Sequence, residues 1–322
     1  MLAQSARQRL PVRTTLIFQM THAPSAMTPV NDFIQVIRGD RTDALPTSEQ
    51  RLYLLVDHAG AQGLVAELRR KVAIPWSSLF DDSTEQGALA VAPILVHFPY
   101  ACASQSELDL LAWLQRACEF STSLTVLNST LEHDSLAFAL KHRLNALLPD
   151  HMPVMLRYFD TRILESLVPV LSPTQRNEFL GIASRWQWLD RAGCLRRLDS
   201  DQLQGDSWPH QFEFDVVQQN ALIDASTADA LVEQMQAHAA DLCRPKTRAE
   251  LHALAERCVP KLDRFAIEDI RTQTLFCLTE LQLGPGFDMQ PAWAERLGRV
   301  TKKQITFEAA MKEPGVWSRP TT

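Results

Sequence analysis

The sequence lacks the cysteine patterns of a metal site or of a disulfide framework. Its cysteines occur singly, with no C-x-x-C pair and no cluster with histidine, at Cys102, Cys118, Cys194, Cys243, Cys258 and Cys277. In a chain of 322 residues this scatter indicates small buried side chains in a reducing compartment. We therefore expect no cofactor.

Long apolar runs and an excess of basic residues are also missing. No run approaches the ~18 residues that span a membrane. The segment LIFQM, which follows Arg7, Arg9 and Arg13, is too short for a secretory signal, and one hypothesis is that translation starts at Met27. The net charge of −6 gives no general positive field for nucleic acid. We expect a cytoplasmic protein that is not secreted and binds neither membranes nor nucleic acid.

The common enzyme motifs do not occur either. There is no G-x-S-x-G, no H-E-x-x-H, no glycine-rich phosphate loop and no EF-hand loop. The one arrangement that resembles an active site is Asp57 with Asp160, because each ends an apolar strand candidate and ligands gather at strand ends in α/β sheets. Two aspartates there could hold Mg²⁺ or supply a nucleophile. The alternative is that each caps a helix N-terminus.

The overall amino-acid composition is that of a globular protein, with 46% hydrophobic and 22% charged residues. The length exceeds the usual limit of a single core and favours two domains, or one domain with a large appendage. Apolar runs at 52–57, 90–98, 123–129 and 154–159 alternate with helical patterns. This alternation predicts an α/β lobe with a mainly parallel sheet flanked by helices.

Helix starts are marked by capping-box spacings at Ser104 with Glu107 and at Ser129 with Glu132. The second of these predicts a helix that ends near Pro149. Its apolar stripe would consist of Leu136, Leu140, Leu144 and Leu147.

The pattern changes after Gly181. RWQWLDRAGCLRRLD predicts two short strands about a turn at Ala192 and Gly193, and QFEFDVV predicts a third, so that a short strand meander follows. From Asn220 onward only helical patterns occur, with a capping box at Thr247 and Glu250 and a helix end at Gly284. We expect a partly disordered N-terminal arm over 1–48, an α/β domain over 49–217 and an all-helical lobe over 218–322.

Several segments, taken in order, resemble one known family. They are YLLVD, WSSLF at 76–80, AVAPILVHF, and LLPDHMPVMLRYFDTRILESLVPVLSPTQRNEFLGI. From Tyr53 to Trp188 the chain resembles the adaptor or chaperone family of type VI secretion effectors (Tap/TEC-type), in which an L-R-F/Y-x-D-P-R-like signature follows a strand and precedes a helix.

The resemblance implies a non-enzymatic adaptor. Such a protein would bind a toxic effector and help to load it onto the valine-glycine-repeat (VgrG) spike. The matching signature residues are Arg157, Asp160 and Arg162, with Asp57 at the end of the first motif strand, whereas Thr161 stands where the family commonly has proline. The alternative function is a metal-dependent phosphate-transfer or hydrolytic enzyme that uses Asp57 and Asp160.

Arg157 interrupts an apolar run, and an unpaired buried charge is strongly disfavoured. We therefore expect a bidentate, partly buried pair between Arg157 and Asp57 or Asp160. Trp186 and Trp188 lie two residues apart in a predicted strand and share a face, for which core packing and partner contact are both open. Trp76 is a further candidate partner contact.

Overall fold

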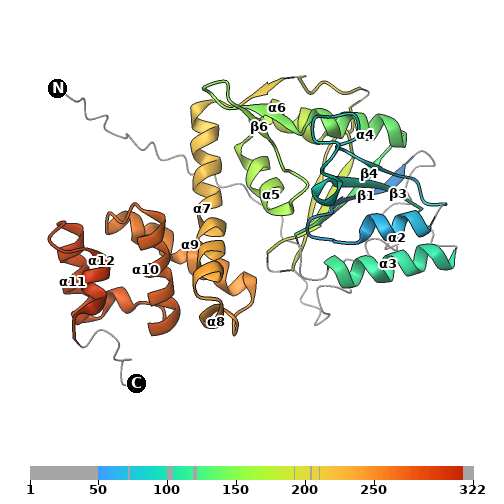
Figure 1. Cartoon of the computed structure of the whole chain (residues 1–322). Helices are drawn as coiled ribbons and strands as arrows, with labels where there is room; N and C mark the ends of the chain where they lie inside the picture. Colours follow the sequence, from blue (N-terminus) through green and yellow to red (C-terminus); the bar gives the residue numbers. More distant parts are fainter. Residues whose placement is uncertain are drawn as a thin grey trace.

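The computed structural model describes residues 50–71, 73–99, 104–118, 122–191, 193–203, 205–209 and 211–314. The expected N-terminal arm over 1–48 lies outside these residues. In Figure 1 a mixed α/β lobe leads through the long helix α7 into a group of helices.

The main sheet has six strands in the order β2-β3-β1-β4-β7-β8. Every neighbouring pair whose register is known runs antiparallel, so the prediction of a mainly parallel sheet is wrong. The strands are β1 (Arg51–Asp57), β2 (Trp76–Ser78), β3 (Pro93–Phe98), β4 (Leu124–Ser129), β7 (Arg185–Leu189) and β8 (Leu195–Asp199).

The arrangement of β1, β3 and β4 explains this error. The helix α3 (Gln105–Cys118) links β3 to β4, and these two strands do point the same way, because each is antiparallel to β1. They are not neighbours, since β1 lies between them. Residues 52–56 of β1 are at most 2% exposed, so β1 reads as the continuous apolar run typical of a parallel strand.

Helices cover both faces of this sheet. Figure 1 shows α2 (Leu64–Arg70) and α3 on one side of β1, β3 and β4, with α4 (His133–His142) on the other. The predicted cap of α3 is confirmed: the Ser104 amide donates to the Glu107 carboxylate and the Glu107 amide donates to the Ser104 hydroxyl. No helix among the described residues is long and apolar enough to cross a membrane.

The helix predicted from the Ser129 cap to near Pro149 is shorter than expected. It ends at His142, and β5 (Asn145–Leu147) follows in a three-stranded sheet of order β6-β5-β9. The predicted Ser129 cap is wrong, because α4 begins at His133 with Glu132 at its N-cap, and the Ser129 hydroxyl accepts the amide of Leu131 instead. The other strands of this sheet are β6 (Pro153–Met155), which is antiparallel to β5, and β9 (Phe212–Glu213), which is parallel to β5.

The hairpin of β7 and β8 is confirmed, with Gly193 at φ 76° in its turn. The third predicted strand is only the two residues of β9. Asp215 then caps α7 (Val216–His238) in a capping box with Gln218, so the two valines of QFEFDVV begin a helix. Two shorter helices precede this region, α5 (Thr161–Val170) and α6 (Pro173–Leu180).

Residues 216–314 form no strand, as predicted. Thr247 and Glu250 make the expected capping box, and Gly284 ends a helix with φ 96°. Aromatic rings fill the core of this lobe, where Phe276 contacts both Phe287 and Phe307. Its helices after α7 are α8 (Ala240–Cys243), α9 (Arg248–Arg264), α10 (Ile270–Leu283), α11 (Pro291–Thr301) and α12 (Phe307–Lys312).

Helix α7 belongs to both parts of the molecule. One continuous apolar cluster runs from Leu52 to Phe214, with Leu222 packed against it, and a second runs from Ala228 to Ala310. The predicted boundary at 217/218 falls inside the first turn of α7. The first half of α7 therefore packs on the α/β lobe, and the second half packs into the helical lobe.

Candidate functional site: a charged junction between the two lobes

The signature residues Asp160 and Arg162 form a tight pair at the start of α5. Asp160 is 4% exposed, and its carboxylate accepts the backbone amide of Arg162 at 3.0 Å, as an N-cap does. The same carboxylate accepts Nε of Arg162 at 3.0 Å and Nη2 at 2.6 Å. The hydrogen bonds to Asp160 raise the pKa of Arg162.

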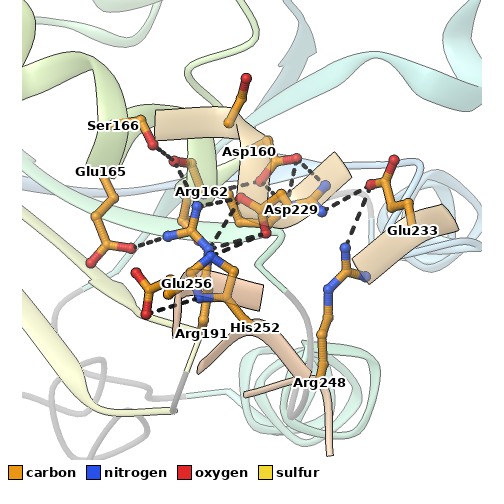
Figure 2. A network of polar contacts seen from close by, with 12 residues as sticks. Asp160, Arg162, Glu165, Ser166, Arg191, Asp229, Glu233, Arg248, His252 and Glu256 are labelled. Atoms are coloured by element: carbon orange, nitrogen blue, oxygen red, sulfur yellow. Dashed lines mark hydrogen bonds and ion pairs between the residues drawn. The ribbon is translucent and has the colours of Figure 1, made fainter. Parts of the chain in front are cut away.

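Arg162 also reaches the helical part of the chain. Its Nη1 lies 3.3 Å from Glu233 of α7. Glu233 in turn lies 3.6 Å from Nη2 of Arg248, at the start of α9. Figure 2 shows these side chains converging from α5, α7 and α9. Arg162, a signature residue, thus contacts the second lobe.

The centre of this network is Arg191, which follows β7 in the hairpin turn. Its Nε and Nη2 donate to both carboxylate oxygens of Asp229 on α7, at 3.2 Å and 2.5 Å, and its Nη1 donates to Glu165 of α5 at 2.6 Å (Figure 2). The side chains of Arg191 and Asp229 are 14% and 17% exposed. This bidentate geometry joins the α/β lobe to α7.

Burial and charge act in opposite directions here. Burial alone would raise the pKa of Asp229, but the hydrogen bonds and charge of Arg191 outweigh it and lower that pKa. Burial alone would lower the pKa of Arg191, but Asp229 outweighs it and raises that pKa. Each group therefore holds its partner in the charged form.

His252 of α9 completes the network. Its Nε2 lies 3.7 Å from Asp229 and its Nδ1 lies 3.6 Å from Glu256, and the side chain is 12% exposed. Burial first, and the charge of Arg191 second, lower the pKa of His252. The imidazole is therefore neutral at neutral pH, and its Nε2 has no hydrogen-bond partner within the described part of the chain.

Asp57 and Arg157 lie outside this junction. A single contact joins them, from Nη2 of Arg157 to Asp57 at 3.4 Å, so the expected bidentate geometry is wrong. The Arg157 side chain is 52% exposed and lies over the ring of Phe159, whereas that of Asp57 is 8% exposed. Arg157 itself follows β6 rather than lying within a strand.

The predicted helix-cap role fits Asp160 but not Asp57. Asp57 accepts the amide of Ala59 at 3.0 Å, which closes a turn, and α2 begins only at Leu64. Burial raises the pKa of Asp57. Over the described ranges, no group of three or more histidine, cysteine, aspartate or glutamate side chains could hold a metal ion.

The tryptophans chosen from the sequence lie in or against the core. Trp186 and Trp188 are 0% and 4% exposed, and the indole N–H of Trp186 donates to the carbonyl of Leu180 at 3.0 Å. Trp76 is half-buried and packs against the same core cluster. Trp186 and Trp188 thus fit the core-packing interpretation.

Sequence reasoning missed Arg191 and Asp229, which are separated by 38 residues. It also missed Arg143, which is 0% exposed and donates to both carboxylate oxygens of Asp206 at 3.0 Å and 2.8 Å. The only local signal for Arg191 was its place at a predicted turn, where a charged side chain is unremarkable.

Residues 52–178 match the family model described as Domain of unknown function (DUF4123). This family is known as the effector-associated domain of type VI secretion, which confirms the resemblance found in the sequence. No curated protein and no solved structure matches the chain. The matched residues include Asp57, Arg157, Asp160 and Arg162. The match to the effector-associated DUF4123 domain of type VI secretion thus covers residues 52–178 of this chain.

Proposed function

We propose that this protein is a cytoplasmic adaptor that binds a toxic type VI secretion effector and assists its loading onto the VgrG spike. The observation that carries the proposal is the family match over 52–178. An adaptor of this kind acts by binding, so its surfaces and the relative placement of its lobes carry its function.

The charged junction supports this role. Asp160 and Arg162 belong to the matched domain, and Arg162 contacts Glu233 on α7. Arg191 fixes the same helix through Asp229. A helical lobe held in one orientation against the family domain gives a partner a single composite surface, which lowers the entropy lost on binding.

Both candidate aspartates already have hydrogen-bond and ion-pair partners within the protein, which favours a structural role for them. Asp160 caps α5 and binds Arg162, and Asp57 closes a turn and contacts Arg157. A metal or a nucleophile site would need these carboxylates to face a substrate instead. The enzyme alternative can be tested directly, because Mg²⁺ binding would raise the melting temperature and Asp57→Asn would abolish that rise.

The test of the adaptor proposal is affinity purification of the tagged full-length protein from its native cell, with mass spectrometry after a moderate-salt wash. We expect one large toxin-like protein, with or without the spike. Deletion of the gene should then abolish secretion of that client alone. Recovery of no specific partner, or normal secretion in the deletion strain, would contradict the proposal.

A further inference from the structure

The edge strands of the two sheets differ in how their outer backbone groups are protected. An exposed edge is a template for another strand, and proteins usually block it. At β2 the outward amide of Ser78 donates to the carboxylate of Asp81 at 3.2 Å. At β8, charged residues stand along the edge, at Arg196, Arg197 and Asp199, and they form ion pairs. Both edges of the main sheet therefore carry protection.

The edge strand β6 carries no charged residue and no such cap. Its hydrogen bonds to β5 include Leu148 N–H to the Met152 carbonyl at 3.0 Å and Leu156 N–H to the Leu144 carbonyl at 2.7 Å. Antiparallel pairing alternates, so Val154, opposite Ala146, also bonds toward β5. The backbones of Pro153, Met155 and Arg157 consequently point away from β5.

These outward positions present a row of backbone amides and carbonyls that could pair with a further strand. They are the carbonyl of Pro153, the amide and carbonyl of Met155, and the amide of Arg157. None of them makes a hydrogen bond with any residue that the structure describes. The proline costs the sheet nothing, because its missing amide proton would have pointed outward.

The side chains beside this edge indicate what kind of segment could bind there. Met152 and Met155 are 50% and 37% exposed, and methionine adapts its shape to a variable apolar partner. The Arg157 side chain is 52% exposed, and within the described ranges Nη2 is the only one of its guanidinium nitrogens with a hydrogen-bond partner. An extended chain with apolar side chains and a carboxylate matches this chemistry.

We propose that the edge of β6 accepts an extended segment of the effector as a fourth strand of the small sheet, with a carboxylate of that segment on Arg157. The inference rests on the proposed function, and it names the place and the mode of binding. Alternating amides and carbonyls recognise an extended backbone, because a helix bonds its own backbone groups internally. The methionines and Arg157 then select which segment binds.

The test uses the effector recovered with the full-length protein and compares three variants. Met155→Pro removes an outward amide proton and leaves the bonds to β5 intact, so we expect about tenfold weaker effector binding from the lost backbone hydrogen bonds. Met155→Leu keeps the amide and an apolar side chain, and is the matched control that should bind as wild type. Arg157→Gln should also weaken binding, more at low salt than at high salt.

Hydrogen exchange keeps the test independent of any folding defect in Met155→Pro. The amides of Met155 and Arg157 should exchange slowly in the wild-type complex and fast in the free protein. Fast exchange at both amides in a complex that forms normally, with wild-type affinity of Met155→Pro, overturns the inference while the adaptor function stands. Failure to recover any effector overturns both.

Two other occupants would also contradict the inference. Protection of Met155 that grows with protein concentration, in the absence of effector, would mean that a second copy of this chain pairs with β6. Protection in the free protein that is lost when residues 1–49 are deleted would mean that the protein's own N-terminal segment occupies the edge. Either result would remove β6 as the effector site.

Discussion

At the scale of single residues, Arg191 is a central link between the α/β lobe and α7. It bonds Asp229 on α7 and Glu165 on α5 at once, so one guanidinium ties two helices to the hairpin turn. Arg157, the residue that stands out in the sequence, has one long contact and is half exposed. Exposed ion pairs contribute little to stability, whereas largely buried ones are costly to break.

We predict that Arg191→Met lowers the free energy of unfolding by about 3 kcal/mol, because it leaves the largely buried Asp229 carboxylate without its main partner. Asp229→Leu should cost a similar amount for the converse reason. The double variant should cost less than the sum, since no unpaired charge remains. Urea unfolding of all four proteins measures the coupling.

The matched control is Arg157→Met in the same background. The Arg157 side chain is 52% exposed and makes one contact of 3.4 Å to Asp57, which keeps its hydrogen bond from the Ala59 amide, so this substitution should change the free energy of unfolding by less than about 1 kcal/mol. Additive losses for Arg191 and Asp229, or a large loss for Arg157, would contradict this account of the junction.

At the scale of elements, the start of α5 accounts for Thr161, which stands where the family that this chain resembles commonly has proline. The amide of Thr161 donates to the carbonyl of Thr122 at 2.9 Å, and its hydroxyl donates to the carbonyl of Leu189 at 3.3 Å. A proline at the first helical position is favourable only where the amide has no partner. Here the amide joins α5 to the segment that leads into β4.

We predict that Thr161→Pro lowers the free energy of unfolding by about 1–3 kcal/mol, because it leaves the carbonyl of the half-buried Thr122 without its hydrogen bond. Thr161→Ala keeps the amide and should cost less. Thermal melts of the two variants measure the difference. A Thr161→Pro variant as stable as Thr161→Ala would mean that the bond to Thr122 contributes nothing.

The boundary between α7 and α9 should respond to pH through His252. Its pKa lies below the ordinary value of 6.5, so the unfolded chain binds more protons than the folded chain as the pH falls past 6.5. Stability should therefore decrease below that pH. Asp229 acts at lower pH: its lowered pKa stabilises the fold above 3.8, and this contribution is lost as the pH falls through the folded-state pKa.

The measurement is the urea midpoint between pH 8 and pH 5 for wild type and His252→Gln. The variant should lose less stability across this range. Burial also lowers the pKa values of His97 and His133, but both remain in each protein, so the difference between the curves reports His252. Parallel curves would contradict the assignment.

Sequence patterns predicted helix caps and turns well, because these features depend on interactions between residues close in sequence. The cap at Thr247, the hairpin about Gly193 and the N-cap at Asp160 follow from short-range chemistry, and the structure has all three. The sheet order does not follow from local chemistry, because the insertion of β1 between β3 and β4 depends on tertiary pairing. The contact between Arg191 and Asp229 could not be predicted for the same reason, because the residues next to each of them in sequence give no sign of it.

At the scale of the whole molecule, α7 makes the two lobes interdependent. Gln218 in its first turns donates to the carbonyl of Val170 at 3.3 Å and to Gln175 at 2.7 Å. Leu222 packs on the first apolar cluster, and Ala228 begins the second. A cut at the boundary expected from sequence would therefore separate the α/β lobe from part of its own packing.

We predict that residues 1–226 unfold in one cooperative transition, whereas residues 1–215 unfold at a lower denaturant midpoint or not cooperatively. The longer piece keeps Gln218 and Leu222 on the α/β lobe, and the shorter piece exposes the surface that they cover. The longer piece lacks Asp229, so Arg191 keeps only its α5 partner and the midpoint should lie below that of the full chain. Urea unfolding followed by circular dichroism compares the three proteins. Equal midpoints for the two pieces would mean that the first half of α7 adds no stability to the α/β lobe, and the domain boundary would then lie at the start of the helix.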